Sequence, residues 1–392
     1  MSADDADSII RAWKTVLDDE TLTNVGADLT VAGISTLRRR FPPKVVAVAL
    51  DWARARTKVA LKWPGRRVIG DVPGIEMASS ERIASHKAKR FERSGGSVLD
   101  LCCGIGGDLM SLARVCDVEG VDTHAVRAWM AEANSGRRVL VTDATSIDLA
   151  GRLIHLDPAR RNEGGRRTVR YDELVPGPEF VEAVAARARG ACVKLMPGID
   201  SELLPDGEVE YVSERGGLTQ ALLWTGALCK EPGVRATAIG DRRTLTITGD
   251  PSVQPPEREI DAFVFVCDPA VERAGLLGAL CGQLDVAMPH PACGMLTAST
   301  LVSSDWLTSF RTLECLPWNR RRVRSAIRAL SGGIVEVKTR GRVVDADAES
   351  AALRGSGDRP LTVFVVRMGS SGVQAVICER LGHASSVHPD RR

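Results

Sequence analysis

The chain has 392 residues, of which 44% are hydrophobic, and its 52 basic and 50 acidic side chains leave a formal net charge of +2. This composition excludes a disordered chain and a histone-like polyanion binder, while local basic patches remain compatible with it. At roughly 150 residues per domain, the length predicts two to three domains.

Signals for targeting, disulfides and metals are absent from the sequence. No window holds the roughly 18 uninterrupted apolar residues of a membrane span, and the acidic N-terminus lacks the basic-then-apolar pattern of a signal peptide. We therefore expect a cytoplasmic protein without a membrane partner. The ten cysteines show no CxxC pair and no zinc-type spacing, so we expect buried, reduced thiols and no metal site.

Residues 1–75 are predicted to form an N-terminal helical region. Apolar residues recur at helical spacing on both sides of the break at Pro42-Pro43, as at Trp13 and Trp52. Basic residues accumulate between positions 38 and 62. A solvated helix face and a contact with a polyanion explain this cluster equally well.

Short apolar runs alternate with helical stretches over residues 76–250, which is typical of a parallel α/β sheet. Two later runs rich in Val, Thr and Ile, at 208–213 and 235–248, could close the sheet as an antiparallel pair. The proline-rich segment 250–256 is predicted to be a linker. The parallel strands are predicted near 97–101, 117–121, 138–142, 152–156 and 191–195.

Residues 260–385 are predicted to form a smaller C-terminal α+β domain. It begins with a strand at 263–266 and a helix at 272–284. Further strands are expected at 334–338 and 362–366, around a basic helix.

The strongest local signal is the apolar strand Val98–Leu101, which runs into a turn that contains Gly104 and Gly106. Glycines let a ligand approach the backbone, and the following helix supplies free N–H donors. The second strand ends in Asp122, 22 residues after Asp100, where a carboxylate can bind ribose hydroxyls. After the third strand, an aspartate could accept a hydrogen bond from an adenine amino group.

Two cofactors are compatible with this arrangement. NAD is disfavoured because Leu109 stands where the dinucleotide fingerprint requires its third glycine. S-adenosylmethionine fits better, because Asp100 suits a cofactor that carries an amino group and no pyrophosphate. The predicted cofactor-binding residues are Asp100, Cys102, Gly104, Gly106, Asp108, Asp122, Asp143 and Ala144.

The fourth strand ends in Asp157-Pro158, and ligands of open α/β sheets bind beyond the carboxyl ends of the strands. These two residues should therefore face the methyl group of the cofactor. Lys194 is a charged residue within the apolar fifth strand, where it either extends its ammonium to solvent or pairs with an aspartate. We predict Asp157, Pro158 and Lys194 as the catalytic residues.

These motifs occur in the order found in class I S-adenosylmethionine-dependent methyltransferases, and the chain resembles that family, which implies a Rossmann-like sheet. The Asp-Pro pair is similar to the Asp/Asn-Pro-Pro-aromatic motif of RNA and DNA amino-methyltransferases, including the trimethylguanosine-synthase relatives. Ala159 and Arg160 replace the second proline and the aromatic residue of that motif, whose aromatic side chain would stack on a flipped base. Asp268–Val271, Pro317–Asn319 and Val335–Gly341 resemble bacterial methyltransferases with a C-terminal THUMP-like domain. This resemblance implies an RNA methyltransferase.

Clustered arginines also indicate a polyanionic partner. One cluster follows the fourth strand, and another lies on the basic helix of the C-terminal domain. Such clusters can contact phosphates, which makes binding salt-dependent. We therefore predict that the chain binds RNA, either tRNA or rRNA, through Arg160, Arg161, Arg320, Arg321, Arg322 and Arg324.

The sequence leaves the methylated atom open. Methylation of pyrimidine C5 requires a cysteine nucleophile, and none stands beside Asp157 in the chain. An exocyclic amine needs mainly orientation by an acceptor such as Asp157, and we favour this target. A 2′-hydroxyl needs a base, which a set of Asp157, Lys194 and Glu214 with Lys87 or Lys89 could provide. A non-catalytic RNA-binding protein and a methyltransferase for small molecules or proteins are further alternatives.

Overall fold

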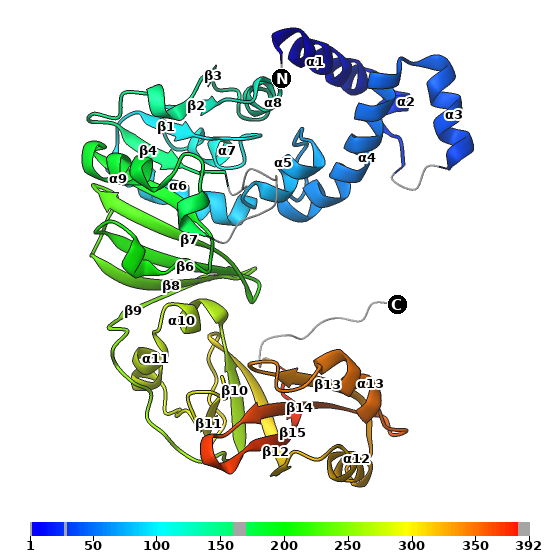
Figure 1. Cartoon of the computed structure of the whole chain (residues 1–392), viewed down its shortest axis with the longest axis vertical. Coiled ribbons are helices and arrows are strands. Elements are labelled where there is room, and N and C mark those ends of the chain that lie inside the picture. The colour runs from blue at the N-terminus through cyan, green and yellow to red at the C-terminus, as the bar shows by residue number, and fades with distance from the viewer. Residues whose placement is uncertain (1, 27–29, 160–169, 383–392) are drawn as a thin grey trace. The chain divides into compact units, whose positions relative to one another are not determined.

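The computed structural model describes residues 2–26, 30–159 and 170–382 (Figure 1). The chain divides into two compact units. The first contains Met1–Glu210 and Gln220–Gly233, and the second contains Tyr211–Thr219 and Val234–Arg392. This division differs from the predicted boundaries, because the N-terminal helices share a unit with the first five strands and the second unit begins before the proposed linker.

The N-terminal region is helical. Its helices are α1 (Ala3–Asp18), α2 (Glu20–Thr23), α3 (Val31–Arg40), α4 (Pro43–Lys62), α5 (Val72–Met77) and α6 (Glu81–Ser94). Trp13 and Trp52 pack edge to face, with ring centroids 5.9 Å apart. The same core includes Ile105 of the glycine turn and Met130 of α8 (Ala125–Ser135). The N-terminal helices therefore pack directly against the predicted cofactor-binding elements.

The large sheet has the order β3-β2-β1-β4-β5-β7-β6-β8-β9. Neighbours among its first five strands are parallel, and the strand order reverses between β1 and β4. β1, β4 and β5 are buried along their whole length, as continuous apolar runs of a parallel sheet should be. The bounds are β1 (Val98–Leu101), β2 (Val118–Asp122), β3 (Val139–Val141), β4 (Leu153–Leu156), β5 (Gly190–Leu195), β6 (Glu208–Glu214), β7 (Gly217–Gly226), β8 (Gly233–Ile239) and β9 (Thr244–Gly249).

The first five strands begin and end within one residue of the predicted positions. The later strands require two corrections. The run 235–248 contains two strands, β8 and β9, which pair antiparallel around a turn closed by a hydrogen bond from Gly240 N to the carbonyl of Arg243. The sequence pattern misses β7, which pairs antiparallel with β5. The remaining helices of the first unit are α7 (Leu109–Leu112) and α9 (Pro178–Arg187), with short 3₁₀ turns η1 (Ala144–Ser146), η2 (Tyr171–Glu173) and η3 (Ser201–Leu203).

Within its described residues, the second unit contains a six-stranded sheet of order β11-β10-β12-β15-β14-β13. β13 and β14 are parallel, and the other neighbours are antiparallel. Two helices pack on β13 and β14 through Val323, Ile327 and Leu353. The bounds are β10 (Phe263–Cys267), α10 (Pro269–Arg273), α11 (Leu277–Gln283), β11 (Leu296–Ala298), β12 (Leu307–Pro317), α12 (Arg320–Ala329), β13 (Gly332–Thr339), α13 (Ala346–Leu353), β14 (Arg359–Arg367), η4 (Gly369–Ser371) and β15 (Val373–Arg380).

The second unit also corrects several predictions. The helix expected at 272–284 is divided into α10 and α11, because Gly275 between them has a φ of +71°. The predicted arginine-rich helix is confirmed as α12, which precedes β13, while the helix between β13 and β14 is α13. The pattern misses β11, β12 and β15.

The ten cysteines are free, yet Cys315 is exposed and four others are only partly buried. No helix in the described part of the chain is both long and apolar enough to cross a membrane.

Candidate active site

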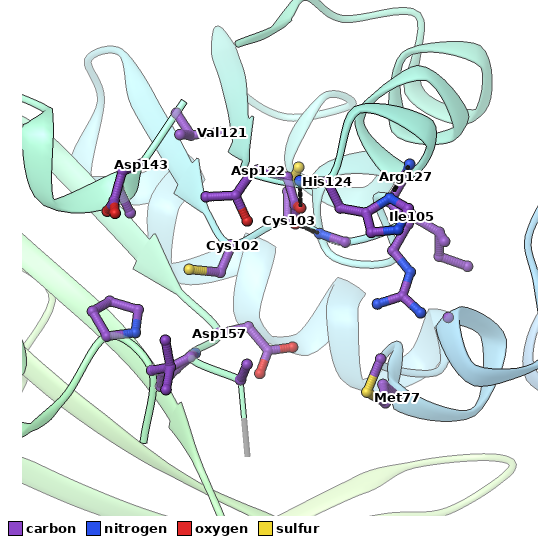
Figure 2. A pocket seen from close by; sticks show the side chains of 18 of the residues that line it. Met77, Cys102, Cys103, Ile105, Val121, Asp122, His124, Arg127, Asp143 and Asp157 are labelled. Carbon is purple, nitrogen blue, oxygen red and sulfur yellow. Dashed lines mark hydrogen bonds between the residues drawn. The ribbon is translucent and has the colours of Figure 1, made fainter. Parts of the chain in front are cut away.

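A cavity of about 410 Å³ lies at the carboxyl ends of β1, β2 and β4, where the order of the parallel strands reverses (Figure 2). Ligands of open α/β sheets bind at such a switch point. The loops after these strands and after β3, together with α5 and the segment 175–176, contribute to the lining. The structure thereby brings together the predicted residues Cys102, Gly104, Asp122, Asp143, Ala144, Asp157 and Pro158.

The two glycines of the turn after β1 have different surroundings. Gly104 has a φ of +56° and Gly106 a φ of +84°, which are conformations that favour glycine. A Cβ on Gly104 would meet no atom within 4 Å, so the space in front of this residue is open to a ligand. A Cβ on Gly106 would lie 3.1 Å from Cα of Ala131 on α8, and Gly106 does not line the cavity. Gly104 therefore permits ligand approach, whereas Gly106 permits helix packing.

Cys102 lines the cavity together with Asp157, so a cysteine does stand near the predicted catalytic aspartate. The sequence analysis missed this neighbour because Cys102 and Asp157 are far apart in the chain. Burial, reinforced by the charge of Asp122, raises the pKa of the Cys102 thiol well above its usual range. The thiol is therefore neutral near pH 7, which does not suit the nucleophile that methylation of pyrimidine C5 requires.

Asp122 ends β2 and holds the loop that surrounds the cavity. Its Oδ2 accepts a hydrogen bond from Gly104 N at 2.8 Å, and its Oδ1 accepts one from His124 N at 2.8 Å. Burial raises the pKa of this carboxyl, while the two backbone hydrogen bonds oppose the shift. A carboxylate fixed in this way presents its remaining lone pairs to the cavity, which suits the hydroxyl groups of a ribose.

Asp143 follows β3 and lies at the opposite end of the cavity from Arg127 in Figure 2. Its Oδ1 accepts hydrogen bonds from the N–H and the hydroxyl of Thr145, both at 2.8 Å. Both hydrogen bonds lower the pKa of Asp143, and the one from the backbone N–H of Thr145 has the larger effect. The buried Ala144 lies beside it in the lining. This end of the cavity offers an ionised acceptor for an amino group.

Asp157 and Lys194 form an ion pair across adjacent strands. Nζ of Lys194 donates to Oδ2 of Asp157 at 2.7 Å and to the carbonyl oxygen of Met77 at 3.0 Å. The Lys194 side chain is 5% exposed and lies outside the lining, whereas Asp157 is 24% exposed and projects into the cavity. Of the two interpretations of Lys194, the structure shows the pairing with an aspartate. The pair fixes one oxygen of Asp157 and leaves the other toward the cavity.

Asp100 and Asp108 lie behind the glycine turn and do not line the cavity. Oδ1 of Asp100 is 2.6 Å from Nδ1 of His155, its partner on β4. Nε2 of His155 is 3.1 Å from Nζ of Lys87, and this ammonium pairs with Asp108 at 2.6 Å. The hydroxyl of Ser79 donates to Asp108 at 2.9 Å. These five side chains form a buried network, which we call the buried Asp-His-Lys network.

The charges in this network are tightly coupled. Burial raises the pKa of Asp100, with His155 opposing the shift. Burial also acts to raise the pKa of Asp108, but the Lys87 ammonium and then His155 hold that pKa well below its usual range. Burial acts to lower the pKa of Lys87, but its acidic neighbours together, Asp108 first among them, raise it above its usual value. A charged Lys87–Asp108 pair therefore lies in the core beside the cavity.

Several lining residues were missed by the sequence analysis. Gly74 and Met77 come from α5, which precedes the glycine turn in the chain, and His124 and Arg127 come from the start of α8. The sequence carries one signal for the latter pair: they closely follow Asp122, at the carboxyl end of a strand. The contribution of α5 depends on tertiary packing that no local pattern predicts.

The remaining candidates lie elsewhere. Arg160 and Arg161 are outside the described residues. Lys89 is exposed on α6 and does not line the cavity, and Glu214 belongs to the second unit. The four predicted arginines on α12 are all exposed. Arg320 binds Glu349 through Nε at 2.9 Å, and the other three are Arg321, Arg322 and Arg324.

Known proteins share parts of this chain and its fold. A family model described as THUMP domain-like matches residues 307–380. The chain is 33% identical over 319 residues to an uncharacterized S-adenosylmethionine-dependent methyltransferase found in two strains of Mycobacterium tuberculosis, a match that covers 78% of this chain and 87% of the relative. The crystal structure of a provisionally assigned methyltransferase from Porphyromonas gingivalis W83 covers 97% of this chain and 100% of its own, with a TM-score of 0.69 and 17% identity, which is a likeness of fold.

Proposed function

Because the chain belongs to the S-adenosylmethionine-dependent methyltransferases, we propose that it transfers the methyl group to an exocyclic amine of a base in structured RNA, either tRNA or rRNA. In this proposal the cofactor places its adenine at Asp143 and Ala144, its ribose at Asp122 and its methyl group toward Asp157. The open space in front of Gly104 supports this placement, because a ligand can approach the backbone there. The bound cofactor supplies an electrophilic methyl group, and the protein orients the acceptor.

The observation that carries the proposal is the fixed carboxylate of Asp157 inside the cavity. Lys194 occupies Oδ2, so Oδ1 is available to accept a hydrogen bond from a substrate amine. Such a bond would orient the nitrogen lone pair toward the methyl group. Orientation is the main requirement for this reaction, because an amine needs no prior deprotonation to attack a sulfonium methyl group.

Methylation of a 2′-hydroxyl is the second candidate, and Lys194 is the residue on which it depends. A lysine acts as a base only when it has lost a proton and its lone pair faces the substrate. Here Nζ of Lys194 is directed at a carboxylate and at the carbonyl of Met77, and Lys194 does not line the cavity, so it does not face a substrate there. The geometry therefore favours the amine over the hydroxyl.

The RNA part of the proposal rests on the second unit. The THUMP-like match covers α12, and four exposed arginines of this helix have no ion-pair partner among the described residues: Arg321, Arg322, Arg324 and Arg328. Arginines in such positions can bind phosphates. A small-molecule methyltransferase has no need of this surface, and a non-catalytic RNA-binding protein has no need of a cavity that presents Asp157.

The arginine surface can be tested with a charge-matched pair of variants. Arg324→Gln/Arg328→Gln should weaken RNA binding. It should also make the decrease of log K, the association constant, with log salt concentration shallower by up to about 2, because each phosphate contact releases counterions. The control Arg11→Gln/Lys14→Gln removes two exposed charges from α1 and should leave both quantities unchanged. Fluorescence anisotropy at several salt concentrations measures both. Equal losses in the two variants would contradict a specific role of α12.

The reaction itself is tested with RNA from a strain that lacks the gene. The full-length protein and methyl-labelled S-adenosylmethionine are incubated with total RNA from the deletion strain and from its parent, and the nucleosides are analysed by mass spectrometry. We expect label on a base in RNA from the deletion strain only. Label on ribose would support the second candidate. Absence of label from RNA, with the cofactor bound, would contradict an RNA substrate.

A further inference from the structure

Arg127 is the only lysine or arginine among the described residues that line the cavity. The same lining contains three carboxylates, those of Asp122, Asp143 and Asp157. S-adenosylmethionine has two cationic groups, a sulfonium and an ammonium, and one anionic group, the carboxylate of its amino-acid part. The carboxylates of the cavity suit the cations, hydroxyls and amines of cofactor and substrate. None of them suits an anion, and this leaves Arg127 as the complementary group.

The position of Arg127 agrees with that role. Figure 2 shows its guanidinium on the α5 side of the cavity, near Met77 and at the far end from Asp143. Adenine and the amino-acid part are the two ends of the cofactor. With adenine at Asp143 and ribose at Asp122, the amino-acid part extends toward α5 and Arg127. This orientation depends on the cofactor alone and is independent of the RNA substrate.

A second carboxylate holds the guanidinium in place. Nη2 of Arg127 donates to Oδ2 of Asp71 at 2.9 Å, and Oδ1 of Asp71 accepts from Gly74 N at the start of α5. Nε of Arg127 is buried and has no hydrogen-bond partner among the described residues. A guanidinium has five N–H donors, so the bond to Asp71 leaves several of them for a ligand. The Arg127 side chain is 20% exposed, and it is therefore reachable from the cavity but largely desolvated.

We infer that Arg127 binds the α-carboxylate of the methionine part of the cofactor, and that Asp71 orients it from α5. Arginine pairs with carboxylates through two parallel hydrogen bonds, and this geometry is specific as well as strong. The contact would link α8, which carries Arg127, through the ligand to Gly74 and Met77 of α5. A purely structural role is the competing explanation, in which Arg127 and Asp71 only join α8 to α5.

Two ligands that differ only in the carboxylate separate these explanations. S-adenosylhomocysteine contains it, whereas the decarboxylated analogue S-adenosyl-3-thiopropylamine retains the amine and lacks it. Calorimetry with the full-length protein should show that the wild type prefers S-adenosylhomocysteine roughly ten- to a hundredfold, as expected for hydrogen bonds to a charged group. In Arg127→Met the affinity for S-adenosylhomocysteine should fall by about the same factor. The analogue should bind nearly as before, so the preference disappears.

The ratio of the two affinities makes the test independent of partial unfolding, because both titrations use the same protein. If Arg127→Met does not fold, Arg127→Gln, which retains a donor for Asp71, can be used to measure the same ratio of affinities. The matched control is Arg137→Met, beyond the end of α8 and outside the lining, and it should preserve the wild-type preference. An equal loss of affinity for both ligands would overturn the inference in favour of a structural role. An unchanged preference in Arg127→Met would also overturn it.

Discussion

The two sides of the glycine turn contain aspartates with opposite surroundings. On the cavity side, Asp122 and Asp143 are held by backbone N–H groups, and each faces open space. On the hidden side, Asp100 and Asp108 are buried and bound to His155 and Lys87. All four are the same residue type within one stretch of the fold.

The difference shows that the position of an aspartate decides whether it is available to bind a ligand or contributes to the stability of the core. A carboxylate that backbone donors fix at the edge of a cavity keeps lone pairs for a ligand, because no charged side chain is paired with it. A carboxylate in the core must have a charged or hydrogen-bonded partner, and it then has little capacity left for binding. Asp157 combines both situations, since Lys194 binds one of its oxygens and the other faces the cavity.

Gly104→Val should have the largest effect on the cavity side, because its side chain fills the space that we propose for the cofactor. We expect the affinity for S-adenosylhomocysteine, measured by calorimetry, to fall below detection. The control Gly136→Val places valine at a similar positive φ, +67° against +56°, with equally open surroundings at the end of α8. It also places a β-branched residue in the left-handed region of φ, and it should bind normally. Normal binding by a folded Gly104→Val would show that the turn is not the cofactor site.

Asp157→Ala should lower methyl transfer by about a hundredfold or more, the effect of losing a residue that orients the acceptor. The affinity for S-adenosylhomocysteine should change only a few-fold, because Asp157 is not among the groups proposed to bind adenine or ribose. Single-turnover kinetics and calorimetry separate the two effects. Near-wild-type transfer by this variant would mean that the reaction takes place elsewhere.

On the hidden side of the glycine turn, Lys87→Met should lower the free energy of unfolding. It leaves Asp108 buried without its cation, and breaking a buried pair in this way costs about 3–5 kcal/mol. The control Lys89→Met lies on the same helix but is exposed and should stay within about 0.5 kcal/mol of the wild type in urea unfolding. Equal urea midpoints of unfolding for Lys87→Met and Lys89→Met would refute the stabilising role of the network.

The same network predicts a pH dependence. Because Lys87 lowers the pKa of Asp108 in the folded protein, the stability that the pair contributes is complete above the unfolded pKa of about 3.9 and is lost as the pH falls toward the folded value. The difference in unfolding free energy between wild type and Lys87→Met should therefore be largest near neutral pH and shrink in more acidic solution, because burial raises the pKa of Asp108 once its cation is removed. A difference that grows on acidification would contradict this coupling.

Lys194→Met should have the smallest effect if the acceptor is an amine, a loss of transfer below about tenfold, since no proton has to be removed by Lys194. For a 2′-hydroxyl the missing base should cost about a hundredfold or more. The rate of methyl transfer to RNA distinguishes the two. A loss as large as that of Asp157→Ala would therefore favour the hydroxyl.

The sequence predicted the parallel half of the large sheet closely, because strands buried on both faces are continuous apolar runs that end in turn residues. It also placed Asp122, Asp143 and Asp157 at one edge, since parallel strands share their carboxyl ends. It could not separate Asp100 from these, because its partner His155 is adjacent only through the pairing of β1 with β4. The contact of Arg127 with Asp71 likewise joins residues 56 positions apart.

The crystal structure of the protein with S-adenosylhomocysteine is the most direct test of the division between the two sides of the glycine turn. We predict adenine beside Asp143 and Ala144, ribose hydroxyls on Asp122 and the sulfur atom facing Asp157, with Asp100 still bound to His155. A ligand that contacts Asp100 directly, or whose sulfur atom points away from Asp157, would contradict the account.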